Sequence, residues 1–246
     1  MSSTVSSDAA DLLTRLGVQY GTGVEHGFCA FYDRHLHRGR ERARKILVIG
    51  VGGGPSLFMW RDYFPNAIIH GIGLERVDVE GADRITIHVA DQADRAQLQA
   101  VIQRAGGDFD VVIDDGGHTM VQQQTSLGVL FPHVRAGGFY VVGDLHTSFV
   151  KVARVSGNGA PEDPRKIGVD VSARTTLDVV DALLAGETVE SEFMLESERD
   201  YLGSTVERVE IFDREGDRRQ MTCIIRKKPF SPWQNLSMRL LQKLLG

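Results

Sequence analysis

Short apolar runs alternate with amphipathic stretches through the middle of this chain, and this alternation predicts its fold. Runs with the length and composition of buried strands lie at residues 46–49, 67–72, 85–89, 109–113 and 138–142. Apolar residues at helical spacing separate several of them, at residues 56–63, 94–105 and 119–131. Strands that alternate with helices of this length predict a parallel sheet with right-handed crossovers.

The pattern differs on both sides of this segment. Before it, amphipathic helices are expected at residues 9–16, with Asp8 as the N-cap, and at residues 28–36. After it, alternating apolar and polar residues at 206–212 and 220–226 predict an antiparallel hairpin at the edge of the sheet.

Further elements are expected near the C-terminus. Residues 156–164 are rich in Gly and Pro and predict a loop, residues 176–184 predict a helix, and leucines at helical spacing predict a last helix over 234–245. The expected architecture is therefore an α/β fold with a mostly parallel seven-stranded sheet that ends in an antiparallel hairpin. The expected domains are a helical cap over 1–44, the main domain over 45–228 and an amphipathic helix over 229–246.

Composition and charge narrow the class of protein. The chain has 246 residues and a net charge of -5, so it has no global basic field that would recruit nucleic acid. Its two cysteines, Cys29 and Cys223, are far apart in sequence and form no CxxC pair, which argues against zinc and disulfides. No signal peptide or membrane-length apolar run is present. We expect a cytoplasmic protein with a small-molecule partner and no nucleic-acid or membrane partner.

Two of the predicted strands end in acidic residues and histidines. The run at 109–113 leads into Asp114, Asp115 and His118, and the run at 138–142 leads into Asp144 and His146. Parallel strands deliver the residues that follow them to the same edge of a sheet. These side chains are therefore expected to form one site suited to acid–base chemistry or to binding a cation.

A glycine-rich turn follows the first strand. Gly50, Gly52 and Gly54 precede Pro55 and a predicted helix, and glycines at a strand-to-helix turn let a ligand approach the backbone closely. Pro55 occupies the third glycine position of the dinucleotide motif, and the Lys-Ser/Thr of a phosphate loop is absent. The turn alone leaves open both a ligand site and a tight turn without a ligand.

Longer matches support the ligand-site interpretation. They are YGT at 20–22, IGVGG at 49–53, MWRDYFP at 59–65, ADQAD at 90–94, DDGGH at 114–118 and DLHTS at 144–148. In this order they resemble the class I S-adenosylmethionine-dependent methyltransferases, in particular the macrolide-type O-methyltransferases that modify deoxysugars on antibiotics. The resemblance extends over most of residues 20–149 and implies a Rossmann-like fold and transfer of a methyl group to a sugar hydroxyl of a glycosylated natural product.

The resemblance also implies roles for individual residues. His118 would be the general base, with Asp115, Asp144 and His146 completing the catalytic group, because a neutral imidazole can take a hydroxyl proton near neutral pH. Asp115 and Asp144 would also hold a divalent cation such as Mg²⁺. The cofactor would contact Gly50, Gly52, Gly54, Glu75, Asp91, Gln92 and Asp114.

The chain departs from the family pattern at three positions. Val48 stands where an acid precedes the glycine turn, and Gly73 replaces the acid that holds the ribose hydroxyls, a role that Glu75 could take over. Gly143 replaces a glutamate that is a metal ligand in relatives, which weakens the metal assignment. Without a cation, the aspartates would serve as helix caps or backbone anchors.

Several alternatives remain open from the sequence. His146, His26 and Tyr32 are candidates for the acceptor pocket, and each has a structural role as its alternative. The three departures leave open a catalytically silent, methyltransferase-like accessory or binding subunit. Pro55 and the C-terminal hairpin disfavour an NAD-dependent oxidoreductase. The leucine-rich C-terminal helix and the family resemblance favour a homo-oligomer.

Overall fold

The computed structural model describes residues 11–22, 27–79, 82–150, 174–213 and 221–230. The predicted cap Asp8, the candidate His26, the loop at 156–164 and the helix at 234–245 lie outside the described residues. Among the helices of the described part, none has the length and apolar character needed to cross a bilayer.

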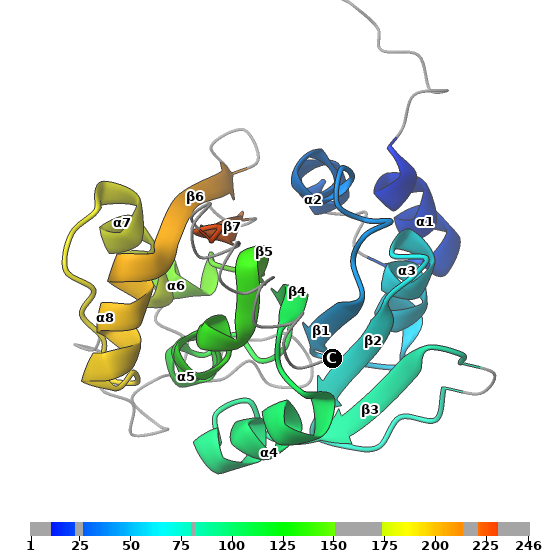
Figure 1. Ribbon diagram of the computed structural model, residues 1–246, viewed down its shortest axis with the longest axis horizontal. Coiled ribbons are helices and arrows are strands. Elements are labelled where there is room, and N and C mark those ends of the chain that lie inside the picture. The colour runs from blue at the N-terminus through cyan, green and yellow to red at the C-terminus, as the bar shows by residue number, and fades with distance from the viewer. Residues whose placement is uncertain (1–10, 23–26, 80–81, 151–173, 214–220, 231–246) are drawn as a thin grey trace, which may run out of the picture.

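A seven-stranded sheet with the order β3-β2-β1-β4-β5-β7-β6 forms the centre of the protein (Figure 1). Its first five strands are parallel, β7 is antiparallel to β5, and β6 is antiparallel to β7 at the edge. This confirms the predicted parallel sheet with a C-terminal antiparallel hairpin. The strands are β1 (Lys45–Ile49), β2 (Ile68–Gly73), β3 (Ile85–Val89), β4 (Phe109–Asp114), β5 (Val134–Val142), β6 (Val206–Asp213) and β7 (Met221–Lys227).

Helices cover both faces of the sheet, and each face has its own hydrophobic core. In β1, Ile46 and Val48 belong to one core, whereas Leu47 and Ile49 belong to the other, as the alternation of side chains along a strand requires. The first core includes side chains of α1 (Leu12–Tyr20), α2 (Phe28–Leu36) and α3 (Pro55–Tyr63). The second includes side chains of α4 (Arg95–Ala105), α5 (Met120–Leu130), α7 (Thr176–Ala185) and α8 (Glu196–Thr205).

Burial on both faces explains why β1 and β4 read as continuous apolar runs. It also explains the identity of Val48. This side chain is 1% exposed within the first core, so a carboxylate at this position would be buried among apolar groups.

Two local features differ from the sequence expectation. Helix α1 begins at Leu12, because Asp11 is the N-cap: its Oδ1 accepts from the Thr14 amide at 2.8 Å. Helix α8 was not predicted, because Leu202 is the one buried residue among its ten and the segment shows no apolar stripe. Two short elements, the 3-10 helix η2 (Phe131–His133) and α6 (Thr147–Val150), complete the described part.

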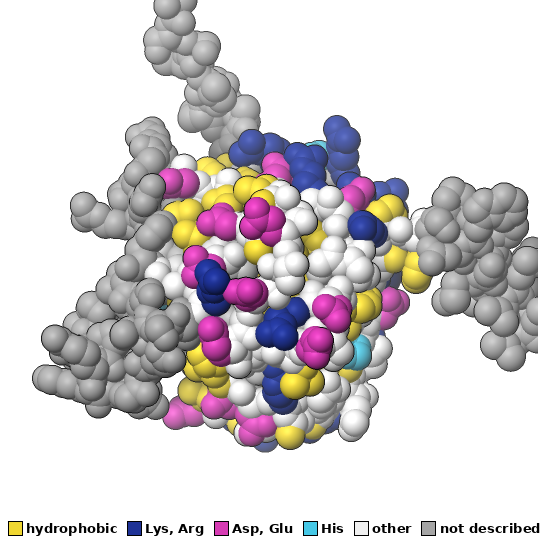
Figure 2. Space-filling view, turned by 90° about the vertical axis from the view of Figure 1, so that its left-hand side faces the viewer, with side chains coloured by type: hydrophobic (Ala, Val, Ile, Leu, Met, Phe, Trp, Pro, Cys, Tyr) yellow, Lys and Arg dark blue, Asp and Glu magenta, His cyan; other side chains and the backbone are white. Residues whose placement is uncertain are grey.

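The face formed by α7, α8 and β6 carries acidic and basic side chains close together (Figure 2). Arg174 Nη2 lies 2.8 Å from Glu190 Oε2, and Arg95 on α4 pairs with Glu198 on α8. Charges of both signs are thus interspersed on this side of the molecule. The candidate site residues lie elsewhere, at the carboxyl ends of the parallel strands.

Candidate active site

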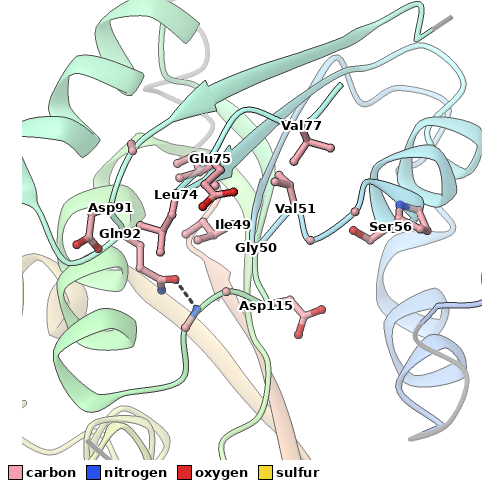
Figure 3. A pocket seen from close by; sticks show the side chains of 18 of the residues that line it. Ile49, Gly50, Val51, Ser56, Leu74, Glu75, Val77, Asp91, Gln92 and Asp115 are labelled. Carbon is pink, nitrogen blue, oxygen red and sulfur yellow. Dashed lines mark hydrogen bonds between the residues drawn. The ribbon is translucent and has the colours of Figure 1, made fainter. Parts of the chain in front are cut away.

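A cavity of about 720 Å³ opens at the carboxyl ends of β1, β2 and β4 (Figure 3). Its walls are the glycine turn at 50–53, the segments 72–77 and 90–92, and the loop at 115–117. In open α/β sheets this edge is where ligands bind. The glycine turn, for which the sequence left a ligand site open, therefore borders a cavity large enough for a small-molecule cofactor.

The glycine turn approaches the neighbouring strand end so closely that it excludes side chains. Gly50 has φ +88°, and a Cβ atom built there would lie 2.0 Å from the backbone oxygen of Asp115. Gly52, at φ +45°, also lines the cavity, whereas Gly54, at φ +102°, is the N-cap of α3 and is not part of the wall. Of the three predicted cofactor-binding glycines, the structure places Gly50 and Gly52 at the cavity.

Glu75 lines the same cavity beyond the end of β2, with its carboxylate turned toward the open space in Figure 3. The position that holds an acid in the family, Gly73, cannot accept a larger side chain without movement. A Cβ atom there would lie 2.6 Å from Val51 Cγ2. The space next to Gly73 is thus filled by Val51, and Glu75 provides a carboxylate two residues later.

Asp91 and Gln92 line the cavity on the side of β3. Asp91 Oδ1 accepts from the Ala93 amide at 2.8 Å, which folds the segment before α4 into a turn. Gln92 is 6% exposed, and its amide reaches toward the 115–117 loop. Both predicted residues therefore reach the cavity.

Asp114, which was predicted on the cofactor side, lies beneath the cavity wall and is not among the residues that line the cavity. It is 1% exposed and accepts hydrogen bonds from Gln92 Nε2 at 3.1 Å, from Tyr140 Oη at 3.2 Å and from Ser126 Oγ. Burial raises the pKa of its carboxyl to about 6, although the hydrogen bond from Ser126, the charge of His118 and the hydrogen bond from Gln92 lower it. Its buried position and its hydrogen bonds indicate that Asp114 supports the loops around the cavity.

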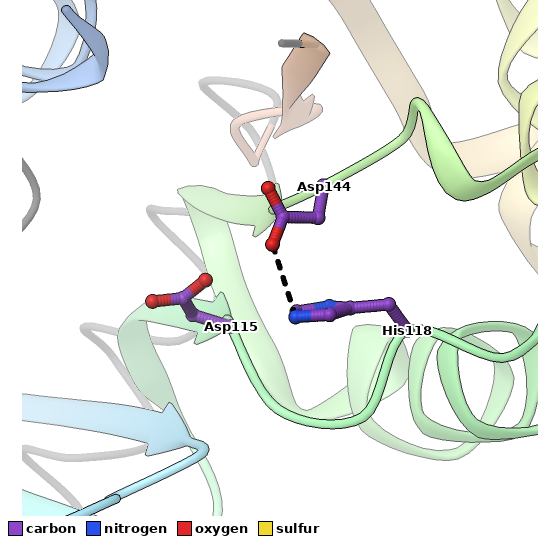
Figure 4. A group of neighbouring side chains, drawn as sticks. All are labelled: Asp115, His118 and Asp144. Atoms are coloured by element: carbon purple, nitrogen blue, oxygen red, sulfur yellow. Dashed lines mark ion pairs between the residues drawn. The ribbon is translucent and has the colours of Figure 1, made fainter. Parts of the chain in front are cut away.

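The predicted catalytic residues converge beside this cavity (Figure 4). One potential ligand atom from each of Asp115, His118 and Asp144 lies within 4.8 Å of the other two. His118 Nε2 is 3.0 Å from Asp144 Oδ2. Asp144 has φ +48°, an uncommon conformation for a residue other than glycine, and this turn brings its carboxylate to the histidine.

Opposing effects act on His118. Burial lowers the pKa of its imidazole, but the hydrogen bond and the negative charge of Asp144 outweigh burial, and the pKa is raised above its usual value. Its Nδ1 is buried without a hydrogen-bond partner among the described residues. We call Asp115, His118 and Asp144 the acid–histidine group, in which the His118 nitrogen that faces Asp144 is Nε2.

The other candidates for the acceptor pocket are placed differently. His146 Nδ1 lies 3.7 Å from Asp144 Oδ1, so this histidine belongs to the same neighbourhood. Tyr32 is buried, and its hydroxyl lies 2.7 Å from Thr222 Oγ1, which in turn donates to the backbone oxygen of Val142. This interior position supports the structural interpretation of Tyr32.

Gly143 faces the acid–histidine group directly. A Cβ atom built at this glycine would lie 3.0 Å from Asp115 Oδ1. The side chain of a glutamate at this position would therefore extend beside the two aspartates, so its absence removes a carboxylate from this group. Asp115, His118 and Asp144 still provide two carboxylates and an imidazole, a donor set that can hold a divalent cation with positions left for water or substrate.

Comparison with known proteins shows that the chain is similar in sequence to methyltransferases. No family model matches the chain. It is 37% identical over 186 residues to L-olivosyl-oleandolide 3-O-methyltransferase of Streptomyces antibioticus, covering 70% of this chain and 45% of that protein. It is 37% identical over 166 residues to mycinamicin VI 2''-O-methyltransferase of Micromonospora griseorubida, covering 63% of this chain and 40% of that protein. The chain thus spans less than half the length of these relatives.

A solved structure of a similar protein supports the fold. The MycE methyltransferase from the mycinamycin biosynthetic pathway, in complex with Mg, SAH (S-adenosylhomocysteine) and mycinamycin VI, superposes with a TM-score of 0.67 at 28% identity. The superposition covers 90% of this chain and 56% of that one. The chain has the Rossmann-like fold of the class I S-adenosylmethionine-dependent methyltransferases and is similar in sequence to the sugar O-methyltransferases of macrolide and tetracenomycin biosynthesis.

Proposed function

We propose that this chain binds S-adenosylmethionine in the cavity and transfers its methyl group to a sugar hydroxyl of a glycosylated natural product. One observation carries this proposal: the group formed by Asp115, His118 and Asp144 lies at the rim of the glycine-lined cavity, with Asp115 belonging to both. A cofactor in the cavity and a hydroxyl at the histidine would therefore be neighbours. Similarity to sugar O-methyltransferases supports the class of acceptor.

The cavity walls suit the parts of S-adenosylmethionine. The glycine turn at Gly50 and Gly52 offers backbone without side chains, and Glu75 offers a carboxylate that can accept from the ribose hydroxyls. Asp91 and Gln92 offer polar groups for the adenine side. We infer that Glu75 takes the role that an acid at position 73 has in the family.

The chemistry requires alignment and the removal of one proton. The methyl carbon forms a bond to the acceptor oxygen, its bond to the sulfonium sulfur breaks, and the hydroxyl proton leaves. The imidazole of His118 is the proposed acceptor of that proton, and Asp144, whose Oδ2 lies 3.0 Å from Nε2, stabilises the imidazolium that forms. Asp115 and Asp144 each place a carboxylate oxygen within 4.8 Å of a ring nitrogen of His118.

Asp115 and Asp144 also fit the role of cation ligands, and the similar MycE structure contains Mg. A bound divalent cation would lower the pKa of the sugar hydroxyl. With Gly143 in place of a further carboxylate, water or the sugar diol would have to complete the coordination.

Methyl transfer can be measured directly. Purified protein is incubated with S-adenosylmethionine carrying a deuterated methyl group and a panel of demethylated glycosides, namely macrolides with deoxysugars and tetracenomycins with rhamnose. The proposal expects a mass gain of one deuterated methyl group on the sugar of at least one glycoside. Transfer to none of them by a protein that binds S-adenosylhomocysteine would favour the silent accessory subunit instead.

We further propose that the protein acts in the cytoplasm as a homo-oligomer, the state that the family resemblance favours. Light scattering coupled to size-exclusion chromatography measures the mass in solution. A mass that matches one chain at micromolar concentration would contradict the homo-oligomer.

A further inference from the structure

Gln92 connects two parts of the site that the sequence treats separately. It belongs to the segment after β3 that lines the cofactor side of the cavity. Its Oε1 accepts from the backbone amide of Gly117 at 2.6 Å, which is the bond drawn in Figure 3. Gly117 immediately precedes His118, so a cavity-lining side chain is bonded to the loop that carries the proposed base.

The loop at 115–118 is shaped to accept this side chain. A Cβ atom at Gly116 would lie 2.2 Å from Gln92 Oε1, so only a glycine leaves room for the amide in this position. On the other side, a Cβ atom at Gly117 would lie 2.2 Å from Oε1 of Gln122, which belongs to the capping box of α5. The two glycines therefore allow the loop to pass between two glutamine side chains, both of which line the cavity.

The nitrogen of the Gln92 amide is bonded to the buried carboxylate of Asp114. Gln92 Nε2 donates to Asp114 Oδ1 at 3.1 Å. The second oxygen of Asp114 accepts from Tyr140 on β5 and Ser126 on α5, and all of these groups are buried. A buried amide with both ends bonded has one orientation, because turning it would leave a donor facing the Gly117 amide.

We propose that Gln92 is a positioning residue that couples the contents of the cofactor cavity to the placement of Asp115 and His118. Cofactor that packs against Gln92 holds the amide in place, and the amide holds the Gly117 backbone through its Oε1. When the cofactor is bound, the loop at 115–118 is thereby held in the position in which His118 faces the acceptor hydroxyl. This inference rests on the proposed function, because it takes S-adenosylmethionine as the occupant of the cavity.

Hydrogen exchange at the Gly117 amide tests the coupling, with S-adenosylhomocysteine as the probe. In the unsubstituted protein the probe is expected to slow exchange at Gly117 about tenfold or more, the effect of one stabilised hydrogen bond. In Gln92→Leu, at a probe concentration that calorimetry shows to saturate this variant, most of this slowing should be lost. Gln92→Glu keeps an acceptor for Gly117, and it should restore part of the slowing.

Tyr140→Phe is the matched control, since it removes another hydrogen bond to Asp114 but leaves Gln92 and Gly117 unchanged. It should keep the full slowing, which a purely structural role of the Asp114 network would not predict. Equal slowing in Gln92→Leu and the unsubstituted protein overturns the inference. If Gln92→Leu does not fold, the inference requires slowing in Gln92→Glu that lies between the unsubstituted protein and no effect. A probe that fails to bind the unsubstituted protein overturns the proposed function first, and calorimetry distinguishes that case.

Discussion

The cofactor cavity and the acid–histidine group both lack a carboxylate that the family pattern contains, but the two losses differ in what surrounds them. At Gly73 the missing side chain's space is filled by Val51, whose Cγ2 lies 2.6 Å from the Cβ position. At Gly143 the Cβ position faces Asp115 Oδ1 at 3.0 Å, which is one of the charged groups of the site. At Gly73 the side chain of Val51 fills the space of the missing acid. At Gly143 the acid–histidine group has one carboxylate fewer.

The two missing carboxylates are therefore expected to affect cofactor binding and cation binding differently. In the cavity, Glu75 offers a carboxylate close to the repacked position, so cofactor binding is expected to survive the replacement. In the acid–histidine group, Asp144 is engaged with His118, and the described residues offer no equivalent of Glu75. Cation binding is therefore the property that the change should weaken most, while the proposed proton transfer would depend on His118 and Asp144.

The largest effect is expected at His118. His118→Ala removes the proposed proton acceptor, so turnover should fall by about 10² to 10⁴. The affinity for S-adenosylhomocysteine should stay within about twofold of the unsubstituted protein, because His118 is not part of the cavity wall. Steady-state kinetics and calorimetry measure the two quantities, and full turnover in this variant would refute its role as the base.

Glu75 provides the next largest effect, this time on binding. Glu75→Gln replaces a charged acceptor by a neutral one and should weaken binding of S-adenosylhomocysteine about tenfold. Asp78→Asn, at an exposed neighbouring acid outside the cavity wall, is the matched control. Equal affinities in both variants would show that Glu75 does not replace the acid missing at Gly73.

Gly143→Glu tests the effect of the carboxylate that is missing at position 143. Its carboxylate should extend beside Asp115 and strengthen binding of Mg²⁺ or Mn²⁺ about fivefold, because carboxylate number tunes the affinity of such sites. Gly143→Ala controls for the crowding of the added Cβ atom. Titration of both variants with Mn²⁺, followed by electron paramagnetic resonance, gives the affinity, and no gain over Gly143→Ala would contradict the account.

The smallest effect concerns the strands beneath the cavity. His70 on β2 and His88 on β3 are buried, with His70 Nδ1 3.0 Å from His88 Nε2. Burial, with the charges of His88 and Lys45, lowers the pKa of His70 to about 4, and burial with the charge of Arg104 lowers the pKa of His88. The unfolded chain takes up these protons first, so the free energy of unfolding should be full above pH 6.5 and fall as the pH drops toward 4.

Thermal unfolding between pH 8 and 5 measures this loss. His70→Gln should flatten the pH dependence, whereas His118→Ala, in the other region, should leave the contribution of the buried pair in place. An unchanged slope in His70→Gln would show that the buried pair does not link folding to pH.

The sequence predicted the parallel half of the molecule well because its central strands β1 and β4 are buried on both faces and its helix caps are local. Phe28–Leu36 was predicted with the bounds that the structure has, and Asp94 and Thr119 were placed at the starts of the following helices. Helix α8 was missed, since it packs mainly through Leu202 and carries charged residues elsewhere. A polar helix held by tertiary contacts leaves no periodic signal.

The site shows the same limit. Strand ends predicted that Asp115, His118 and Asp144 would converge, because pairing in a parallel sheet fixes where chains leave it. Three features required coordinates: the burial of Asp114, the filling of space by Val51 and the bond from Gly117 to Gln92. Each depends on side-chain packing between segments distant in sequence, which the pattern of residues does not encode.

The central claim is that the glycine-lined cavity takes S-adenosylmethionine, and a calorimetric titration tests it most directly. S-adenosylhomocysteine and NAD are each titrated into the unsubstituted protein under the same conditions. The account predicts saturable binding of S-adenosylhomocysteine with one molecule per chain and no binding of NAD. Binding of NAD, or no binding of S-adenosylhomocysteine, would contradict it.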